Sequence, residues 1–320
     1  MTQHWRHLVS RVTRPLYAPH VSTGIARVAS NGIEIAYETF GEPGNLPLLL
    51  IMGLGTQLIA WPDELCADLA GRGMHVIRFD NRDTGLSTHL DGAASPSPAA
   101  VVLKRTEPPY QIDDMARDAT GLLDALELPS AHVVGASMGG FIAQTMAIET
   151  PSRVRSLTLI MTSTGSRRVG YPRPSVVVKA LRRRPQRTAE EAVDAVVETF
   201  KLIGSPGYPF DEHSLRDLAR RSFERGQDAS GYLRQLAAIL AQPDRTSRLQ
   251  RLDVATTVIH GLSDPLVGVT GGLALARAIK GARFVGFSGM GHDLPRPVLG
   301  QLADEIADVV ARGEERAGWR

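Results

Sequence analysis

Six short apolar runs recur along the chain, each with the length and composition of a buried strand. They are "LPLLLIM", "HVIRFD", "AHVVGAS", "VRSLTLIM", "ATTVIHG" and "ARFVGFS". Most are separated by segments whose apolar residues follow a helical spacing, such as "WPDELCADLAGRG", "QIDDMARDATGLLDALEL" and "MGGFIAQTMAIETP". Strands that are apolar throughout are typical of a parallel sheet covered by helices on both faces. The pattern therefore predicts an α/β fold with a mostly parallel sheet.

A different pattern precedes these runs. The segment "GIARVASNGIEIAYETFG" alternates apolar and polar residues on both sides of Asn31-Gly32, two residues that tolerate the positive φ of a tight turn. We predict an antiparallel hairpin here, at the start of the sheet.

The strand-helix alternation stops after "LTLIMTST". Three segments of helical period follow, "AEEAVDAVVETFKLIG", "DEHSLRDLARRSFERG" and "SGYLRQLAAILAQ". Such a stretch is too long for a loop, so we predict a helical cap over residues 165–253, inserted in a core formed by 24–164 and 254–320, after a basic arm at 1–23. The apolar face of "YLRQLAAIL" is expected to roof the functional site and to favour an apolar ligand.

Composition excludes several classes of protein. The 320 residues are 43% hydrophobic and 22% charged, a globular balance with enough chain for a large core. A formal net charge of +2 gives no general attraction for nucleic acid, so no nucleic-acid partner is expected. A single cysteine, Cys66, excludes a disulfide framework and a multi-cysteine metal site, and we expect it to serve in packing. No histidine pairs at ligand spacing with a second ligand, so no metal or cofactor is expected.

The first twenty residues, "MTQHWRHLVSRVTRPLYAPH", are basic and lack the apolar core of a secretory signal. No run approaches the ~20 apolar residues of a membrane span, and we expect a cytoplasmic protein. A loosely ordered arm is the favoured interpretation, and an amphipathic arm in peripheral contact with a membrane is the alternative. The basic run at 179–187 is expected to be a solvated face, with attraction of acidic substrates or a membrane surface as the alternative.

The strongest chemical signal is "HVVGASMGGFIAQTMA", in which a strand enters a tight turn and a helix leaves it. A turn of this kind crowds neighbouring backbone, so small residues are needed two positions before and after Ser137. The serine then projects above the sheet at a helix N-terminus, where developing negative charge is favoured. We predict that Ser137 is a nucleophile, and an ordinary helix cap is the alternative.

A nucleophilic serine needs a base and an acid that orients the base. In this fold class they follow the serine in the order acid, then histidine, each after a later strand. "TTVIHGLSDPLV" supplies Asp264 and "ARFVGFSGMGHDLP" supplies His292 in that order. Taken singly, each could be an ordinary loop residue. His260 precedes the proposed acid, which is the wrong order, and is interpreted as structural.

Other carboxylates have simpler explanations. Asp80 and Asp83, in "FDNRDTGLST", are expected to tie down their loop, with Arg82 as an available partner. Asp113 and Asp114 open a helix and are interpreted as capping or solvated charges.

The glycines of "LLLIMGLGTQLIAW" allow two interpretations. A dinucleotide fingerprint would want a third glycine where Leu58 stands and an acid at the end of the next strand, which Asp80 supplies. However, a hairpin precedes this strand, and Trp61-Pro62 interrupts the helix that should follow. With a nucleophilic serine nearby, the loop is better suited to hold an oxyanion, with the Leu54 and Met138 amides as donors.

Together "MGLG", "FDNRDTGLS", "GASMGG", "HGLSDP" and "GMGHDLP" resemble the α/β-hydrolase superfamily, and more narrowly the bacterial esterases that include aclacinomycin methylesterase and the mycobacterial lipase/esterase group. The resemblance covers about residues 25–310. It implies an α/β-hydrolase fold with Ser137 as nucleophile, Asp264 as acid, His292 as base, and Leu54 and Met138 as oxyanion donors. Many members begin the oxyanion loop with His-Gly, where this chain has Met-Gly.

We therefore expect a serine hydrolase that cleaves a small apolar carboxylic ester through an acyl-enzyme. A thioesterase or phospholipase acting through the same residues is one alternative. A hydrolase scaffold that binds a small molecule without turnover is the other.

Overall fold

The computed structural model describes residues 21–28, 32–93, 107–181, 188–226 and 228–317. Most of the predicted arm, the Asn31 half of the hairpin turn and most of the basic run at 179–187 lie outside these ranges. No helix within the described ranges has a stretch long and apolar enough to cross a lipid bilayer.

Strands within the described residues form one eight-stranded sheet in the order β1-β2-β4-β3-β5-β6-β7-β8. β1 pairs antiparallel with β2, and β2 pairs antiparallel with β4, whereas all other pairs are parallel. The predicted hairpin is confirmed, since Val28 pairs with Ile33 across it. The strands are β1 (Val21–Val28), β2 (Ile33–Phe40), β3 (Leu46–Ile51), β4 (Met74–Phe79), β5 (Ala131–Ala136), β6 (Val154–Ile160), β7 (Ala255–Gly261) and β8 (Arg283–Phe287).

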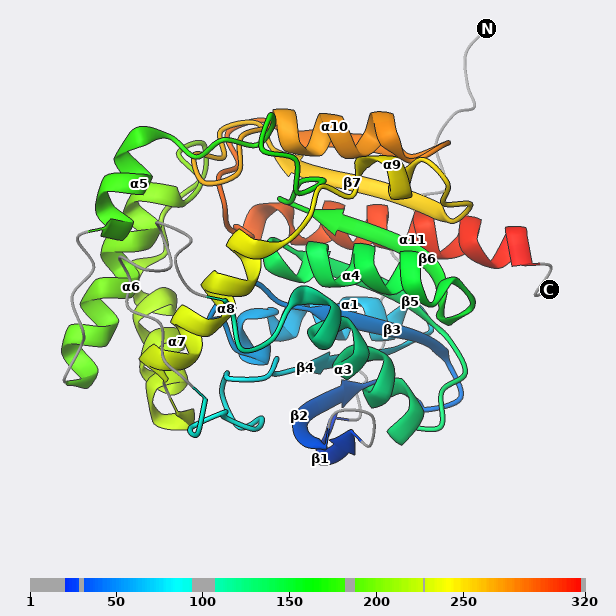
Figure 1. Ribbon diagram of the computed structural model, residues 1–320, viewed down its shortest axis with the longest axis horizontal. Helices are drawn as coiled ribbons and strands as arrows, with labels where there is room; N and C mark the ends of the chain where they lie inside the picture. The colour runs from blue at the N-terminus through cyan, green and yellow to red at the C-terminus, as the bar shows by residue number, and fades with distance from the viewer. Residues whose placement is uncertain (1–20, 29–31, 94–106, 182–187, 227, 318–320) are drawn as a thin grey trace, which may run out of the picture.

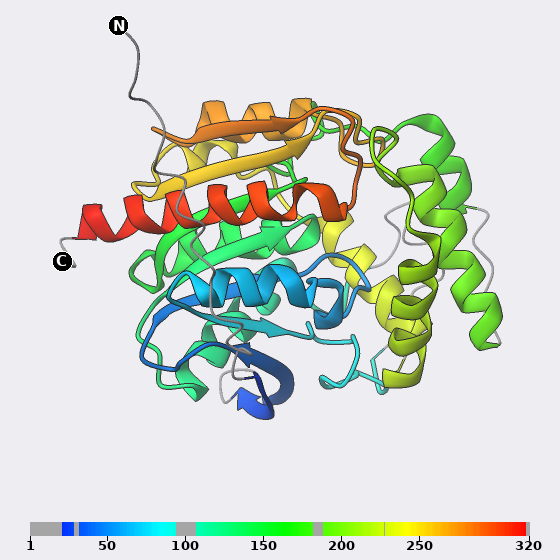
Figure 2. The same cartoon turned by 180° about the vertical axis from the view of Figure 1, so that it is seen from behind.

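Helices cover both faces of the sheet, as the apolar strands predict (Figures 1 and 2). On β3, Leu49 and Ile51 face one hydrophobic cluster, and Leu48 and Leu50 face the other. The first cluster includes residues of α3 (Ile112–Ala125), α4 (Met138–Glu149) and α10 (Thr270–Ala278). The second includes residues of α1 (Asp63–Gly71) and α11 (Leu299–Ala317). Single 3₁₀ turns, η1 (Leu58–Ala60), η2 (Pro151–Arg153) and η3 (Arg296–Val298), link these elements.

Between β6 and β7 the described residues contain helices and no strand. These helices are α5 (Pro174–Leu181), α6 (Ala189–Ile203), α7 (Glu212–Arg225), α8 (Ala229–Ala241) and α9 (Thr246–Leu249), all within the predicted cap range. Helices α6, α7 and α8 each begin at an N-cap residue. The side chains of Thr188, Asp211 and Asp228 each accept a hydrogen bond from a backbone N–H of the first turn. Figure 1 shows α5, α6 and α7 beyond one end of the sheet, with α8 leading back toward it.

Charged residues join these helices, α5 to α9, which we call the cap, to the rest of the protein. Arg234 of α8 is 1% exposed and donates to both carboxylate oxygens of Asp83, at 2.8 and 2.7 Å, and to Asp228 at 2.7 Å. Arg225 of α7 donates to Asp80 at 2.6 Å. A buried charge is tolerated where it is paired and hydrogen-bonded in this way.

These contacts correct one expectation. Arg82 is not the partner of Asp80 or Asp83. Its guanidinium forms a bidentate ion pair with Asp118 of α3, with N–O distances of 2.5 and 2.6 Å. The two loop aspartates are instead neutralised from the cap, which a reading of the local sequence does not reveal.

Replacing Arg234 tests how firmly the cap is attached. Burial by itself would raise the pKa of Asp83, but hydrogen bonds from Arg234, the Leu90 backbone amide and the Tyr110 hydroxyl lower that pKa overall. Arg234→Met leaves the Asp83 carboxylate buried without its cationic partner, so we expect a loss of about 3 kcal/mol of unfolding free energy at neutral pH, measured by urea denaturation.

The same variant carries a pH signature. A depressed carboxylate pKa contributes stability above the unfolded pKa that is lost as pH falls through the folded one. The difference in unfolding free energy between the wild type and Arg234→Met should therefore become smaller at acidic pH. Arg221→Met, which breaks an exposed ion pair with Asp217, is the control and should cost at most about 0.5 kcal/mol. Equal losses in the two variants would contradict the assignment.

Candidate active site

Ser137 occupies the turn between β5 and α4, where the backbone is tightly crowded. Its φ of 54° and ψ of −115° lie outside the regions that L residues prefer. A Cβ on Gly135 would lie 2.3 Å from the Gly139 carbonyl oxygen, and one on Gly139 would lie 2.1 Å from the Ile51 carbonyl oxygen. The glycines on both sides of Ser137 are therefore required by space, and the turn presents the hydroxyl above the carboxyl end of β5.

His292 and Asp264 converge on this hydroxyl from the ends of two later strands. His292 follows β8, and its Nε2 atom lies 3.0 Å from Ser137 Oγ. Asp264 follows β7, and its Oδ2 atom lies 2.7 Å from His292 Nδ1. The structure thus brings together the three side chains that the sequence singles out.

The hydrogen bonds also select a tautomer of the imidazole. A carboxylate only accepts hydrogen bonds, so His292 Nδ1 carries a proton and donates a hydrogen bond to Asp264. The second oxygen of Asp264 accepts the Leu266 and Val267 amides at 2.8 and 2.9 Å, which fixes the carboxylate plane. The Nε2 lone pair is then directed at the Ser137 hydroxyl, the geometry required of a general base.

His260 lies close to Asp264, but its ring bonds a backbone carbonyl and not the serine. Its ring is fully buried, and Nε2 donates to the Val267 carbonyl at 2.8 Å. Burial lowers the pKa of His260, so the ring is neutral at pH 7. Its Nε2 atom is 3.8 Å from Asp264 Oδ2.

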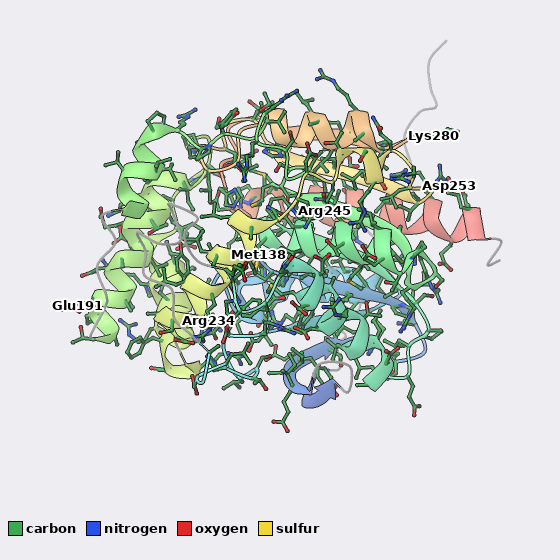
Figure 3. All side chains as sticks on the ribbon, viewed as in Figure 1. Met138, Glu191, Arg234, Arg245, Asp253 and Lys280 are labelled. Carbon is green, nitrogen blue, oxygen red and sulfur yellow. The ribbon has the colours of Figure 1, made fainter. Side chains whose placement is uncertain are left out.

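The glycine loop after β3 lies directly against the serine. A Cβ on Gly53 would lie 3.1 Å from Ser137 Cβ. Met138 is the first residue of α4, and the described residues offer no hydrogen-bond acceptor to its amide or to that of Leu54. In Figure 3, Met138 lies in the region where α8 meets the core, far from Asp253 and Lys280 at the opposite end of the sheet.

Two observations oppose the dinucleotide interpretation of this loop. The helix does not leave the glycines directly, because α1 begins at Asp63 after Pro62. The carboxylate of Asp80 is already occupied, since it accepts the Leu58 amide at 2.7 Å and the Leu86 amide at 3.0 Å in addition to Arg225.

The segment that carries His292 is held by the last residue of α6 and by the turn after it. The His292 amide donates to the Ile203 carbonyl at 2.7 Å, and the Gly291 amide donates to Ser205 Oγ at 2.8 Å. The Ser205 hydroxyl in turn bonds the Asp293 carboxylate. Burial raises the pKa of Asp293 above its usual range. Sequence reasoning missed this contact, although an acid directly after a candidate base is a signal worth following.

The remaining predicted residues also have identifiable surroundings. Cys66 is fully buried on α1, and burial raises its pKa to about 12, which agrees with a packing role. The Asp114 carboxylate accepts a hydrogen bond from the backbone amide of Gln111 at 2.8 Å, as expected of a capping residue.

Among the described residues, one acidic cluster has the spacing of metal ligands. Ligand atoms of Asp83, His89 and Asp228 lie within 4.8 Å of one another. The guanidinium of Arg234 donates to both carboxylates, so a cation already neutralises this cluster.

Comparison with known proteins supports the fold and the enzyme class. The chain is 32% identical to rhodomycin D methylesterase DauP of Streptomyces sp. strain C5 and 31% identical to DnrP of Streptomyces peucetius, which has the same activity name. Each comparison covers 87% of this chain and 95% of the relative. These names support the prediction of a carboxylic ester hydrolase.

Solved structures agree with the architecture. The enol-lactonase of Burkholderia xenovorans LB400 superimposes with a TM-score of 0.68 at 24% identity, covering 90% of this chain and all of the other. The alpha/beta hydrolase fold family matches residues 47–295. The sheet order, the serine turn and this match lead to one conclusion: the chain belongs to the alpha/beta hydrolase fold family.

Proposed function

We propose that the protein is a serine hydrolase of carboxylic esters, with Ser137 as nucleophile, His292 as general base and Asp264 as the acid that orients it. The observation that carries the proposal is the continuous hydrogen-bonded line from Ser137 Oγ to His292 (3.0 Å) and from His292 to Asp264 (2.7 Å). We assign the oxyanion to the Leu54 and Met138 amides. Met138 follows Ser137 in the chain, Leu54 follows Gly53, which lies against Ser137, and the described residues offer neither amide an acceptor.

The reaction proceeds in two halves. His292 Nε2 removes the Ser137 proton as Oγ bonds to the ester carbonyl carbon, and the carbonyl oxygen becomes an oxyanion held by the two amides. The C–O bond to the alcohol then breaks, and the alcohol leaves with the proton from His292. Water attacks the acyl-enzyme in the same manner, releasing the carboxylic acid and restoring the serine. Asp264 remains ionised and stabilises the transient imidazolium.

The named relatives suggest where to look for a substrate. DauP and DnrP are methylesterases, so we propose a small-molecule ester with a small alcohol group as the first class to test. Thioesters and phospholipids belong in the same panel, because the same residues serve them equally. A scaffold that only binds its ligand would leave the whole panel unhydrolysed.

Ser137→Ala should reduce kcat for a short nitrophenyl ester by about 10⁶-fold, because the variant lacks the serine oxygen that attacks the ester carbonyl. A fluorophosphonate probe should label the wild type on the peptide that contains Ser137 and leave the variant unlabelled. Ser130→Ala, just before the opposite end of β5, is the matched control and should retain full activity. Turnover by Ser137→Ala would reject the assignment.

Asp264→Asn should lower kcat by about 10⁴-fold with little change in thermal stability, because an amide no longer fixes the imidazole in its productive tautomer. Asp293→Asn tests the alternative acid beside His292. Its carboxylate bonds Ser205 rather than the ring, so kcat should stay within about tenfold of the wild type. The reverse ranking would transfer the acid role to Asp293.

The raised pKa of Asp293 predicts a change in stability with pH. A carboxyl group whose folded pKa is above its unfolded value stabilises the fold below the unfolded pKa, and that contribution is lost as pH rises through the folded pKa. Asp293→Asn never ionises, so its melting temperature should rise relative to that of the wild type between pH 4 and pH 7. A difference that is independent of pH would show that Asp293 ionises without cost.

A further inference from the structure

One residue of the cap reaches the loop that we assign to the oxyanion. Gln235 lies on α8, and its side chain is fully buried. Its Oε1 atom accepts a hydrogen bond from the Gly55 amide at 2.7 Å, although the two residues are 180 positions apart in the chain. Its Nε2 group donates to the Arg82 carbonyl at 2.7 Å and to Thr84 Oγ1 at 2.8 Å. The core loop at 82–84 therefore orients the amide that holds Gly55.

The Leu54–Gly55 peptide is bonded at both of its polar atoms. Gln235 accepts its N–H, and Thr56 Oγ1 donates to its carbonyl oxygen at 3.0 Å. Because a peptide unit is planar, holding this unit restricts the ψ angle of Leu54. The preceding peptide, which carries the Leu54 N–H, is attached to the same Cα atom, so its freedom to turn away from Ser137 is reduced.

Packing from the same helix leaves the loop little freedom. Gly55 has a φ of 61°, and a Cβ there would lie 2.7 Å from the ring of Tyr232. The adjacent Arg234 anchors α8 through Asp83. The loop is thus enclosed between β3, from which it leaves, and a helix whose own position is fixed by a buried ion pair.

We propose that Gln235 is a positioning residue, which keeps the Leu54 amide aimed at the oxyanion by holding the next peptide of the loop. The cap would then contribute to the rate of the chemical step as well as to selection of the substrate. The inference rests on the proposed function, since it assumes that Leu54 N–H meets the oxyanion.

The chain offers a closely matched control. Gln57 is also a buried glutamine that makes three hydrogen bonds between core and cap, donating to the Ser222 and Gly226 carbonyls and accepting from Arg225. None of its bonds involves the Leu54–Gly55 peptide. Replacing either glutamine with methionine keeps the side-chain length and removes the same number of hydrogen bonds.

We expect Gln235→Met to lower kcat by about 10- to 100-fold with KM changed less than about twofold, since a misplaced donor acts mainly on the transition state. The inhibition constant of a trifluoromethyl ketone, whose adduct places an oxyanion in the same site, should rise by the same factor as kcat falls. Gln57→Met should lower the melting temperature by a similar amount, but its kcat and its inhibition constant should stay within about threefold of the wild-type values.

Hydrogen exchange of the peptide covering 52–57 gives a readout that needs no turnover. Exchange at the Gly55 amide should accelerate in Gln235→Met and not in Gln57→Met. If Gln235→Met does not fold, Thr84→Val removes one of the bonds that orient Gln235 and should lower kcat in the same direction, by several-fold. Unchanged kcat in folded Thr84→Val would then overturn the proposal.

The results of these experiments distinguish a failure of the proposed function from a failure of the role proposed for Gln235. Wild-type protein with neither ester hydrolysis nor labelling of Ser137 would overturn the proposed function. An active wild type in which Gln235→Met retains kcat, loses only substrate affinity, or behaves as Gln57→Met does would overturn the role of Gln235 alone.

Discussion

The backbone of Ser137 carries a φ of 54°, a conformation that costs an L residue on the order of 1–3 kcal/mol and persists only where its surroundings enforce it. Enforcement comes from a central strand on one side and α4 on the other, with Gly135 and Gly139 leaving no space for side chains between them. The hydroxyl is consequently presented at the carboxyl end of the sheet. Every other feature of the site is placed relative to that point.

The partners of Ser137 arrive there because β7 and β8 run parallel to β5 and end at the same edge. Parallel strands bring loops that are distant in sequence to one edge of a sheet. The sequence separation of 155 residues between Ser137 and His292 therefore has no bearing on their distance in space. The final orientation of these side chains is set by local hydrogen bonds. Two backbone amides hold the carboxylate of Asp264, and Asp264 holds the imidazole of His292.

The cap adds a second set of constraints to the same site. The turn after α6 bonds the segment that carries His292, and α8 bonds the loop that carries Leu54. Both contacts lie beside charged groups, the half-buried Asp293 in the first case and the buried pair of Arg234 with Asp83 in the second. The helical region between β6 and β7 therefore contacts both the segment that carries the proposed base and the loop that carries the proposed oxyanion donor.

Short-range information in the sequence was sufficient for the sheet, the hairpin, the serine turn and the helical character of the region between β6 and β7, because glycine spacing and apolar periodicity act on neighbouring residues. It also selected Ser137, Asp264 and His292, because in this fold class the acid and the histidine follow the serine, each after a later strand. The helices α10 and α11 are not among the predicted elements, although Leu302, Ile306 and Val310 recur at helical spacing.

Only the tertiary structure decided the pairing of charges. Arg82 stands between Asp80 and Asp83 in the chain, yet it bonds Asp118, while cap arginines more than a hundred residues away bond the two loop aspartates. The same holds for Gln235, whose segment has an apolar periodicity in which a buried glutamine is not distinctive. A buried polar group is satisfied by whichever partner the packed helices bring within reach, and the packing of α7 and α8 on the core is a property of the whole fold.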